Sequence, residues 1–247
     1  MDKVLYLAMS GARENMLAQQ AHANNLANAN TTGFKSDLAQ ARAMQVFGDG
    51  HASRVYAQTE RPATNLSSGT LIETGRKLDL AVAGDGWMTV IRPDGTEAYT
   101  RGGELQVDAT NQLVTGSGLP VMGNGGIPII LPPYENLDIA TDGTITVRPL
   151  GDNANELVLV DQIKLVNPDT GTLFKDRDGL MVTDGNQVLQ PDANVRIRSG
   201  YIESSNVNAV NELTGIISAS RQFEMQVRMM KTAEENSEAA AAILRMS

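Results

Sequence analysis

The sequence predicts an α+β protein in which two terminal, coiled-coil-like helices pack together and antiparallel all-β domains are inserted between them. Two observations predict the helices: apolar residues recur at steps of three and four before Asn30, and again after Leu213. A third predicts the inserted part, because from Leu78 onward apolar and polar residues alternate with a period of two. The expected segments are a helix over 1–35, a connector over 36–77, a β-rich body over 78–200 and a helix over 201–247.

The first helix is expected to run from about Lys3 to Ala29. Its seam, meaning the a and d positions of the heptad, carries few large apolar side chains, because small and polar residues fill about half of the positions. We therefore expect this helix to be loosely ordered in the free monomer and to fold with copies of itself or with related subunits. The seam positions are Leu5, Met9, Ala12, Met16, Gln19, Ala23, Leu26 and Asn30.

A helix stop follows at 28–33, where asparagine and glycine tolerate the left-handed backbone and threonine resists continuing the helix. Phe34 is expected to be a packing anchor that sets the direction in which the chain leaves. A helical turn is predicted to resume from Ser36 to Ala43. Glycines and serines then predict an irregular connector, with a return to strand at Gly69 to Ile72.

The body is expected to consist of short strands in two parts, 78–125 and 126–200. Turn sequences such as Pro93-Asp94-Gly95 and Asp142-Gly143 separate the strands and favour an antiparallel barrel or sandwich over βαβ units. Trp87 is expected in the core or at the edge of the first part. The predicted strands are 78–82, 87–91, 97–100, 106–107, 112–114, 120–122, 127–131, 137–139, 144–147, 157–166, 172–174, 179–183, 187–190 and 195–202.

The last helix is expected to begin after one of three possible caps, Asn206, Asn208 or Asn211, among which the sequence does not choose. Its steps of three and four match those of the first helix. We expect a ring or helix of such helical pairs to bury both seams, with the bodies outside. The seam positions are Leu213, Ile216, Ser220, Phe223, Val227, Met230, Glu234, Ser237, Ala241 and Leu244.

Composition narrows the possible partners. The formal net charge is −9, and residues 36–200 carry 13 basic and 21 acidic side chains, so we expect no binding to nucleic acid. No run of eighteen apolar residues occurs, and no membrane insertion is expected. Ser10, Gly11 and Arg13 interrupt the N-terminal apolar stretch, which argues against a cleavable signal peptide; if the chain acts outside the cytoplasm, it must leave by another route.

The residues of catalytic and metal sites are scarce. The chain has no cysteine, and its two histidines, His22 and His51, are far apart in sequence without a nearby pair of carboxylates, which disfavours zinc. The sequence contains no EF-hand loop, phosphate-binding P-loop or G-x-S-x-G elbow. We therefore expect no cofactor, no metal and no enzymatic activity.

Three segments carry a family resemblance. Residues 23–35, ANNLANANTTGFK, resemble the NNLAN-x-N-T-x-GFK signature of bacterial flagellar rod and hook axial proteins. Residues 85–87 and 98–103 resemble their middle block, GxGFF and YTRxGxF, with Met88 and Leu105 in place of aromatic residues. Residues 200–208, GYIESSNVN, followed by Glu212, Arg221, Phe223 and Glu224, resemble their C-terminal signature. The match is spread over nearly the whole chain.

The resemblance implies a structural subunit that assembles with copies of itself and with other rod subunits through its terminal helices. The assembly residues that we predict from the seams and the signatures are Leu5, Met9, Ala12, Met16, Ala23, Asn24, Asn25, Leu26, Asn28, Gly33, Phe34, Ser205, Asn206, Val207, Leu213, Ile216, Phe223, Glu224, Val227, Met230 and Leu244. Resemblance also implies export by the flagellar type III apparatus, without a cleavable signal peptide, to the rod in the periplasm, where the tubular shaft transmits motor torque.

Within the family, the single tryptophan, the opening MDKVLYLAM and the run Arg221 to Gln226 most resemble the proximal-rod type. The connector is too short for the insert expected of the distal-rod type, and the hook type is much larger. Outside the family, a secreted β-rich binding module would need an exposed aromatic or charged groove. A carbohydrate-acting enzyme would need two carboxylates at catalytic separation in a cleft.

Overall fold

The computed structural model describes residues 3–38, 41–45, 55–59, 63–150 and 157–246. The chain forms two compact units, each assembled from segments that are distant in sequence. The helical unit comprises Met1–Ala29, Ser36–Asn65 and Val207–Ser247, and the β unit comprises Asn30–Lys35 and Leu66–Asn206. Both kinds of secondary structure are present, which confirms the α+β class. Whether the four predicted segments fold as separate domains stays a prediction.

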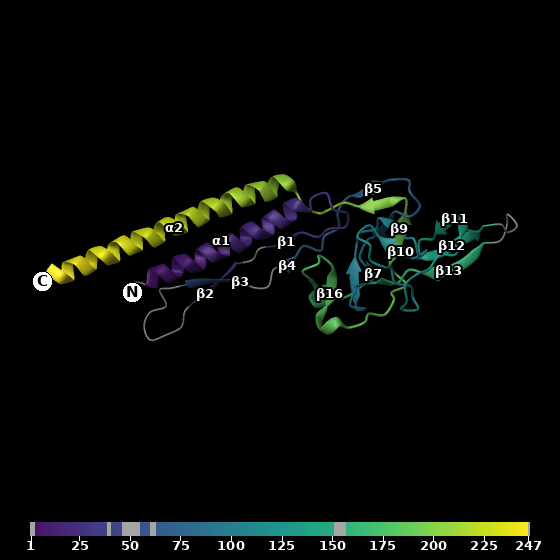
Figure 1. Ribbon diagram of the computed structural model, residues 1–247, viewed down its shortest axis with the longest axis horizontal. Helices are drawn as coiled ribbons and strands as arrows, with labels where there is room; N and C mark the ends of the chain where they lie inside the picture. The colour runs from purple at the N-terminus through teal and green to yellow at the C-terminus, as the bar shows by residue number, and fades with distance from the viewer. Residues whose placement is uncertain (1–2, 39–40, 46–54, 60–62, 151–156, 247) are drawn as a thin grey trace. The chain divides into compact units, whose positions relative to one another are not determined.

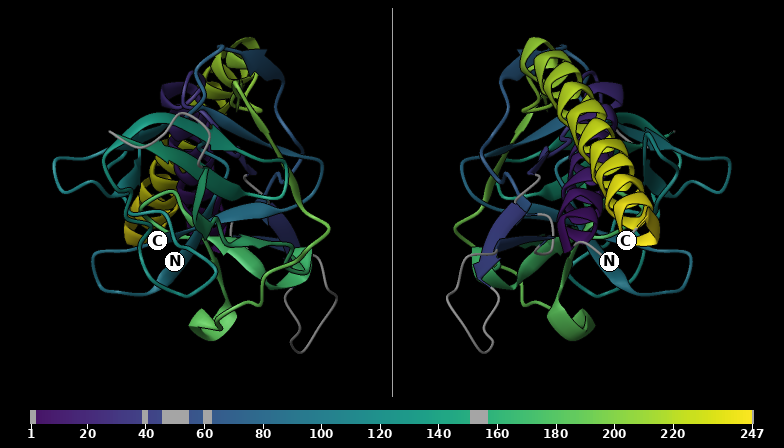
Figure 2. Two further views of the ribbon diagram at one scale, coloured as in Figure 1. Left: turned by 90° about the vertical axis from the view of Figure 1, so that its right-hand side faces the viewer. Right: turned by 90° about the vertical axis from the view of Figure 1, so that its left-hand side faces the viewer.

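The helical unit contains two long helices that lie side by side, α1 (Lys3–Ala27) and α2 (Ala209–Met246), as Figures 1 and 2 show. The helices run antiparallel, since the start of α2 lies beside His22 and its middle lies beside Gly11. Asn208 is the cap left open by the sequence: its side-chain oxygen accepts hydrogen bonds from the backbone N–H groups of Val210 and Asn211 at 3.1 and 3.3 Å.

Two antiparallel strand pairs complete the helical unit. Strand β1 (Asp37–Leu38) pairs with β4 (Ala63–Thr64), and β2 (Ala41–Gln45) pairs with β3 (Val55–Thr59). The predicted helical turn at Ser36 to Ala43 is therefore wrong. The segment is too short for its apolar pattern to specify a helix. Its backbone conformation is instead determined by pairing with strands farther along the chain. Gly48 and Gly50, two of the residues from which the irregular connector is predicted, and His51 lie outside the described residues.

In the β unit every described strand pair is antiparallel, as predicted. The largest sheet has the order β14-β7-β8-β16-β15, and a second has the order β11-β12-β13. The bounds are β5 (Leu71–Glu73), β6 (Leu80–Ala83), β7 (Trp87–Ile91), β8 (Glu97–Thr100), β9 (Leu105–Val107), β10 (Leu113–Thr115), β11 (Tyr134–Ile139), β12 (Thr144–Pro149), β13 (Val158–Gln162), β14 (Leu165–Val166), β15 (Leu173–Lys175), β16 (Met181–Thr183), β17 (Arg196–Ser199) and β18 (Tyr201–Glu203), with 3₁₀ turns at Thr170–Thr172 and Asp184–Asn186.

Three further strand pairs complete the unit. The pairs β5 with β18 and β6 with β17 join its N-terminal part to its C-terminal part, and β9 pairs locally with β10. Most predicted strands are confirmed, but 120–122 and 127–131 contribute only isolated bridges, and 187–190 is not a strand. The last segment follows the 3₁₀ turn at Asp184–Asn186, and the hydroxyl of Thr183 donates a hydrogen bond to the carbonyl of Gln187 at 2.9 Å. Local hydrogen bonding around this turn outweighs β propensity there.

A shared hydrophobic core lies among these small sheets. Leu80, Leu113, Ile129 and Ile145 are fully buried in its main cluster, to which both predicted parts of the body contribute. Trp87 is 6% exposed and packs with Tyr99, Val166 and Met181, which confirms its expected core position. In the described part of the chain, the helices are too polar to qualify as membrane spans.

Candidate functional site

The predicted seam of α1 is largely exposed to solvent in the single chain. Leu5, Met9 and Met16 are 38, 54 and 65% exposed, and Ala23 is exposed as well. Ala12 is buried and Leu26 is half-buried. Three of the four large apolar residues of this seam are therefore exposed, although apolar side chains gain free energy when they leave water.

The seam of α2 is arranged in the same way. Leu213, Phe223 and Val227 are 49, 37 and 42% exposed, and Glu224 is exposed. Ile216 and Met230 are half-buried. Leu244 belongs to α2, but its side chain lies outside the described residues.

Contacts between α1 and α2 use residues beside the predicted seams. His22 Nδ1 lies 2.5 Å from a carboxylate oxygen of Glu212, and the imidazole ring covers Gly215. Gly11 faces the side-chain amide of Gln226. A Cβ at either glycine would approach these side chains to 2.7–2.8 Å, so the absence of a side chain makes room for the amide of Gln226 and the imidazole of His22 between the helices. A search for large apolar residues misses such a contact.

Residues of the N-terminal signature mainly form hydrogen bonds near the C-terminal end of α1. Asn25 is 1% exposed, and its amide makes two hydrogen bonds with the backbone of Asp37, donating at 2.9 Å and accepting at 2.8 Å. Its side chain thus pairs with β1 as a neighbouring strand would. Asn28 donates to the backbone carbonyl and the side chain of Asn24 at 3.0 and 2.8 Å. These contacts lie within one chain, so Asn25 is enclosed before any assembly.

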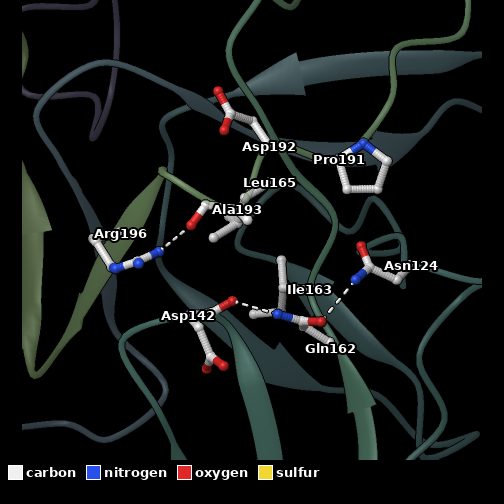
Figure 3. Close-up of a pocket in the computed structure, with 9 residues that line it drawn as sticks. All are labelled: Asn124, Asp142, Gln162, Ile163, Leu165, Pro191, Asp192, Ala193 and Arg196. Carbon is white, nitrogen blue, oxygen red and sulfur yellow. Dashed lines mark hydrogen bonds between the residues drawn. The ribbon is translucent and has the colours of Figure 1, made fainter.

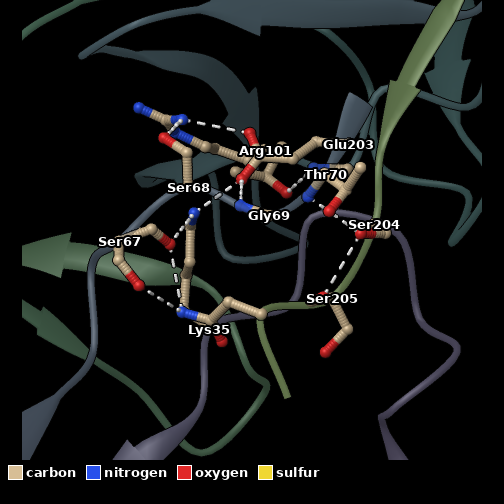
Figure 4. Close-up of polar contacts among 12 residues, drawn as sticks. Lys35, Ser67, Ser68, Gly69, Thr70, Arg101, Glu203, Ser204 and Ser205 are labelled. Carbon is tan, nitrogen blue, oxygen red and sulfur yellow. Dashed lines mark hydrogen bonds and ion pairs between the residues drawn. The ribbon is translucent and has the colours of Figure 1, made fainter. Parts of the chain in front are cut away.

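The β unit contains a buried charge cluster made of Lys35, Arg101 and Glu203, which are 2, 3 and 0% exposed (Figure 4). One carboxylate oxygen of Glu203 accepts hydrogen bonds from Lys35 Nζ at 2.7 Å and from the backbone N–H of Gly69 at 2.8 Å. The other accepts from Arg101 at 3.0 Å. Both oxygens of this buried anion are therefore satisfied by donors from three separate chain segments.

Arg101 and Lys35 use their remaining donors on neutral groups. Arg101 donates to the backbone carbonyls of Gly84 and Gly86 at 2.7 and 2.9 Å and to the hydroxyl of Ser68 at 3.0 Å. Lys35 also donates to the carbonyl of Ser67 at 2.8 Å. The guanidinium lies 5.2 Å and the ammonium 5.9 Å from the centre of the Trp87 ring, within the range of cation–π attraction.

The cluster carries more positive than negative charge. In the described part of the chain, Glu203 is the one carboxylate that pairs with either Lys35 or Arg101. Burial lowers the pKa of Lys35 from its ordinary value, and the hydrogen bond to Glu203 opposes that effect. Removal of the anion would leave two buried cations without compensation, which is far more costly than losing one cation.

Backbone contacts bring both signatures to this cluster. Gly33 donates its N–H to the carbonyl of Glu203 at 2.8 Å, and Asn206 donates to the carbonyl of Phe34 at 3.3 Å. Lys175 covers the ring of Phe34 at 3.7 Å and donates to the carbonyl of Lys35 at 2.9 Å. Phe34 is half-buried, and these contacts agree with its expected role as an anchor.

Two glycines permit this close packing. Gly33 has a φ of +67°, and a Cβ there would lie 2.2 Å from the carbonyl carbon of Arg101. A Cβ at Gly69 would lie 1.9 Å from the carbonyl oxygen of Ser204. The chain can adopt this arrangement only where no side chain is present.

The charged residues of the cluster are absent from the set predicted from sequence, although Gly33, Phe34, Ser205 and Asn206 flank them. The signal was available, since each of the three signatures contains one charged residue of the cluster: GFK contains Lys35, YTRGG contains Arg101 and YIESSN contains Glu203. No single-sequence pattern indicates that residues so far apart meet. Ser205 and Val207 are half-buried and continue the segment toward α2.

A polar pocket of about 350 Å³ lies elsewhere in the β unit (Figure 3). Its lining includes two carboxylates, but their oxygens already stabilise local turns: Asp142 accepts from Thr144 N–H at 3.0 Å, and Asp192 accepts from Asn194 N–H at 2.8 Å. The hydrogen bond from Thr144 lowers the pKa of Asp142, so this group is ionised near neutral pH and unsuited to act as a general acid. Among the described residues, no group of three potential metal ligands occurs.

Three family descriptions match the chain. "Flagella basal body rod protein" matches residues 5–35, "Flagellar hook protein FlgE/F/G D1 domain" matches residues 81–147, and "Flagellar basal body rod FlgEFG protein C-terminal" matches residues 198–243. The first and third cover the terminal signatures. Together the three matches include all three residues of the charge cluster.

Full-length relatives agree with these matches. The chain is 39% identical to the flagellar basal-body rod protein FlgF of Escherichia coli K12 and 39% identical to FlgF of Salmonella typhimurium LT2, covering 100% of this chain and of each relative. It is 32% identical to the rod protein FlgG of Agrobacterium fabrum C58, over 92% of this chain and 95% of that protein. The resemblance to structural rod proteins is confirmed, and the chain belongs to the flagellar basal-body rod protein family.

Proposed function

We propose that this chain is a structural, non-enzymatic subunit of the flagellar proximal rod and that α1 and α2 form its assembly surface. The observation that carries this proposal is the exposure of large apolar residues along both helices, in a protein of the rod family. Neighbouring copies and other rod subunits would cover Met9, Met16, Leu213 and Phe223 in coiled-coil-like contacts. The gain is about 25 cal/mol for each Å² of apolar surface removed from water.

The small-residue contact within one chain and the exposed seams have different roles in this proposal. Gly11 and Gly215 make room for the side chains of Gln226 and His22 between α1 and α2, while most large apolar seam residues stay exposed. A helical pair of this kind can contact several neighbours at once. Repeated around an axis, such contacts would make a tube stiff enough to transmit torque.

We infer a location in the periplasmic part of the basal body, reached through the type III export apparatus without a cleavable signal peptide. Residues 5–35 match the rod family, and most of them form α1, which packs against α2. A cleaved leader would not be expected to supply a helix of the mature fold. The same argument favours export of the chain with this segment retained.

The test introduces charge into the seam of α1. We expect Met16→Glu to fail to restore swimming to a strain that lacks the protein, because a carboxylate would be buried at the contact between subunits. Gln20→Glu is the matched control: Gln20 is also exposed on α1 but lies outside the seam, and we expect normal swimming. Immunoblots of purified basal bodies would measure incorporation.

The purified Met16→Glu protein should melt at the wild-type temperature, since Met16 is 65% exposed in the single chain. Swimming and incorporation at wild-type levels would refute an assembly role for this seam. Equal loss of swimming and of incorporation in the Gln20→Glu strain would also argue against it, because the effect would then not be specific to the seam position.

A further inference from the structure

The charge cluster joins the N-terminal signature, which contains Lys35, to the C-terminal signature, which contains Glu203. Residues 28–32 separate Gly33 from the end of α1, and residues 207–208 separate Asn206 from the start of α2. Between these points, the segments 33–35 and 203–206 are hydrogen-bonded to each other. Both helices therefore connect to the β unit through one small region in which the two segments are hydrogen-bonded to each other.

We infer that Glu203 is a positioning residue that holds the connections to α1 and α2 together, and that subunit assembly requires this junction as well as a folded β unit. Glu203 bonds at once to Lys35 of the N-terminal signature, to Arg101 of the middle block and to Gly69 before β5, while its own backbone carbonyl accepts from Gly33. No other residue in the described contacts joins all of these segments. The inference deepens the proposed function and rests on it for its assembly readout.

The number of buried charges that each variant leaves without a partner predicts an order of melting temperatures. Lys35→Met leaves Arg101 and Glu203 as a neutral pair, whereas Glu203→Gln leaves two buried cations and no anion. A buried ion without its partner costs more than the loss of a balanced pair. We therefore expect Glu203→Gln to lower the melting temperature more than Lys35→Met does.

The double variant separates charge from shape. In Lys35→Met with Glu203→Gln, one of the two uncompensated cations is gone, so we expect a melting temperature above that of Glu203→Gln alone. Additive losses from the two single changes would refute the electrostatic role of Glu203. Circular dichroism of the purified full-length proteins measures all four melting temperatures, and this arm does not depend on rod assembly.

The positioning role needs a comparison at equal stability. Core truncations remote from the cluster, Leu113→Ala and Val90→Ala, provide proteins of lowered melting temperature with an intact junction. At a matched melting temperature, we expect the core variants to be incorporated into basal bodies and Lys35→Met to be incorporated at least several-fold less. Lys35→Arg, which keeps the charge, should recover part of that loss.

Equal incorporation of Lys35→Met and a core variant of the same melting temperature would overturn the positioning role, because the cluster would then act only through stability. Failure of the proposed function would look different. In that case Met16→Glu would assemble normally, while the order of melting temperatures among the cluster variants would remain as expected.

Discussion

At the scale of single residues, the cluster shows how small groups determine where charges can be buried. Glu203 is fully enclosed, and its carboxylate is satisfied by an ammonium, a guanidinium and a backbone N–H. The backbone can supply that N–H because Gly69 lies directly against the carbonyl of Ser204. The glycine thus contributes to an ion pair without carrying any charge.

We expect Gly69→Ala to destabilise the protein by about 1–3 kcal/mol or more, because the new methyl group would lie 1.9 Å from a backbone oxygen that cannot move freely. Gly171→Ala is the matched control, since a Cβ there meets nothing within 4 Å and the backbone has no positive φ. Urea unfolding of both variants measures the difference. Equal stability of the two would show that the junction is more loosely packed than its short contacts indicate.

Sequence reasoning reaches part of this residue-scale detail. Gly33 and Phe34 are predictable as a helix stop and an anchor, because glycine and aromatic residues carry clear local signals. Lys35, Arg101 and Glu203 are not predictable as a site, since charged residues are usually exposed and nothing in one sequence indicates that these three meet. The exact cap of α2 also requires the structure, because three asparagines are equally suitable.

At the scale of elements, periodicity predicts both helices and most strands, and it fails where the pattern is short. Helix α1 ends at Ala27, within two residues of the expected end. The segment 36–43 is predicted to be helical, but its residues 37–38 and 41–43 pair as strands with segments that a local pattern cannot identify. The heptad pattern correctly predicts a helix near each end of the chain. The contact between α1 and α2 involves glycines, however, and a pattern of apolar residues does not detect them.

We expect the helices to be the least protected elements in the free chain. Hydrogen–deuterium exchange of dilute, monomeric protein should show fast exchange in most of α1 and α2 and slow exchange in β6, β7 and β10, whose residues are almost all buried. The helices bury few large apolar residues, so their order depends on neighbours. Slow exchange throughout both helices at low concentration would contradict this expectation.

At the scale of the whole molecule, the two compact units are interleaved along the chain. The helical unit takes its segments from both ends, and the β unit takes residues 30–35 as well as 66–206. The predicted boundary after residue 35 coincides with a limit of these units, whereas the boundaries after 77 and after 200 do not, because the units change at 65 and at 206. We propose that 1–35, 36–77, 78–200 and 201–247 remain useful as functional segments, with the signatures at their borders.

A truncation tests this organisation. We expect a fragment of residues 30–206 to fold and to melt cooperatively, because it retains the complete β unit. A fragment of residues 36–206 lacks Gly33 and Lys35 and should melt at a clearly lower temperature. Circular dichroism compares the two. Identical melting curves would mean that residues 30–35 are not part of the folded β unit.

The separation of Lys35 and Glu203 has a consequence for the order of folding. Their side chains meet across 168 positions of sequence, so an emerging chain cannot complete this ion pair until almost all of it is free. Until then, any compact form would enclose Lys35 and Arg101 without a counter-ion, which is unfavourable. Under the export route proposed above, this delay would favour passage of an unfolded chain, because compact forms remain unfavourable until Glu203 is available.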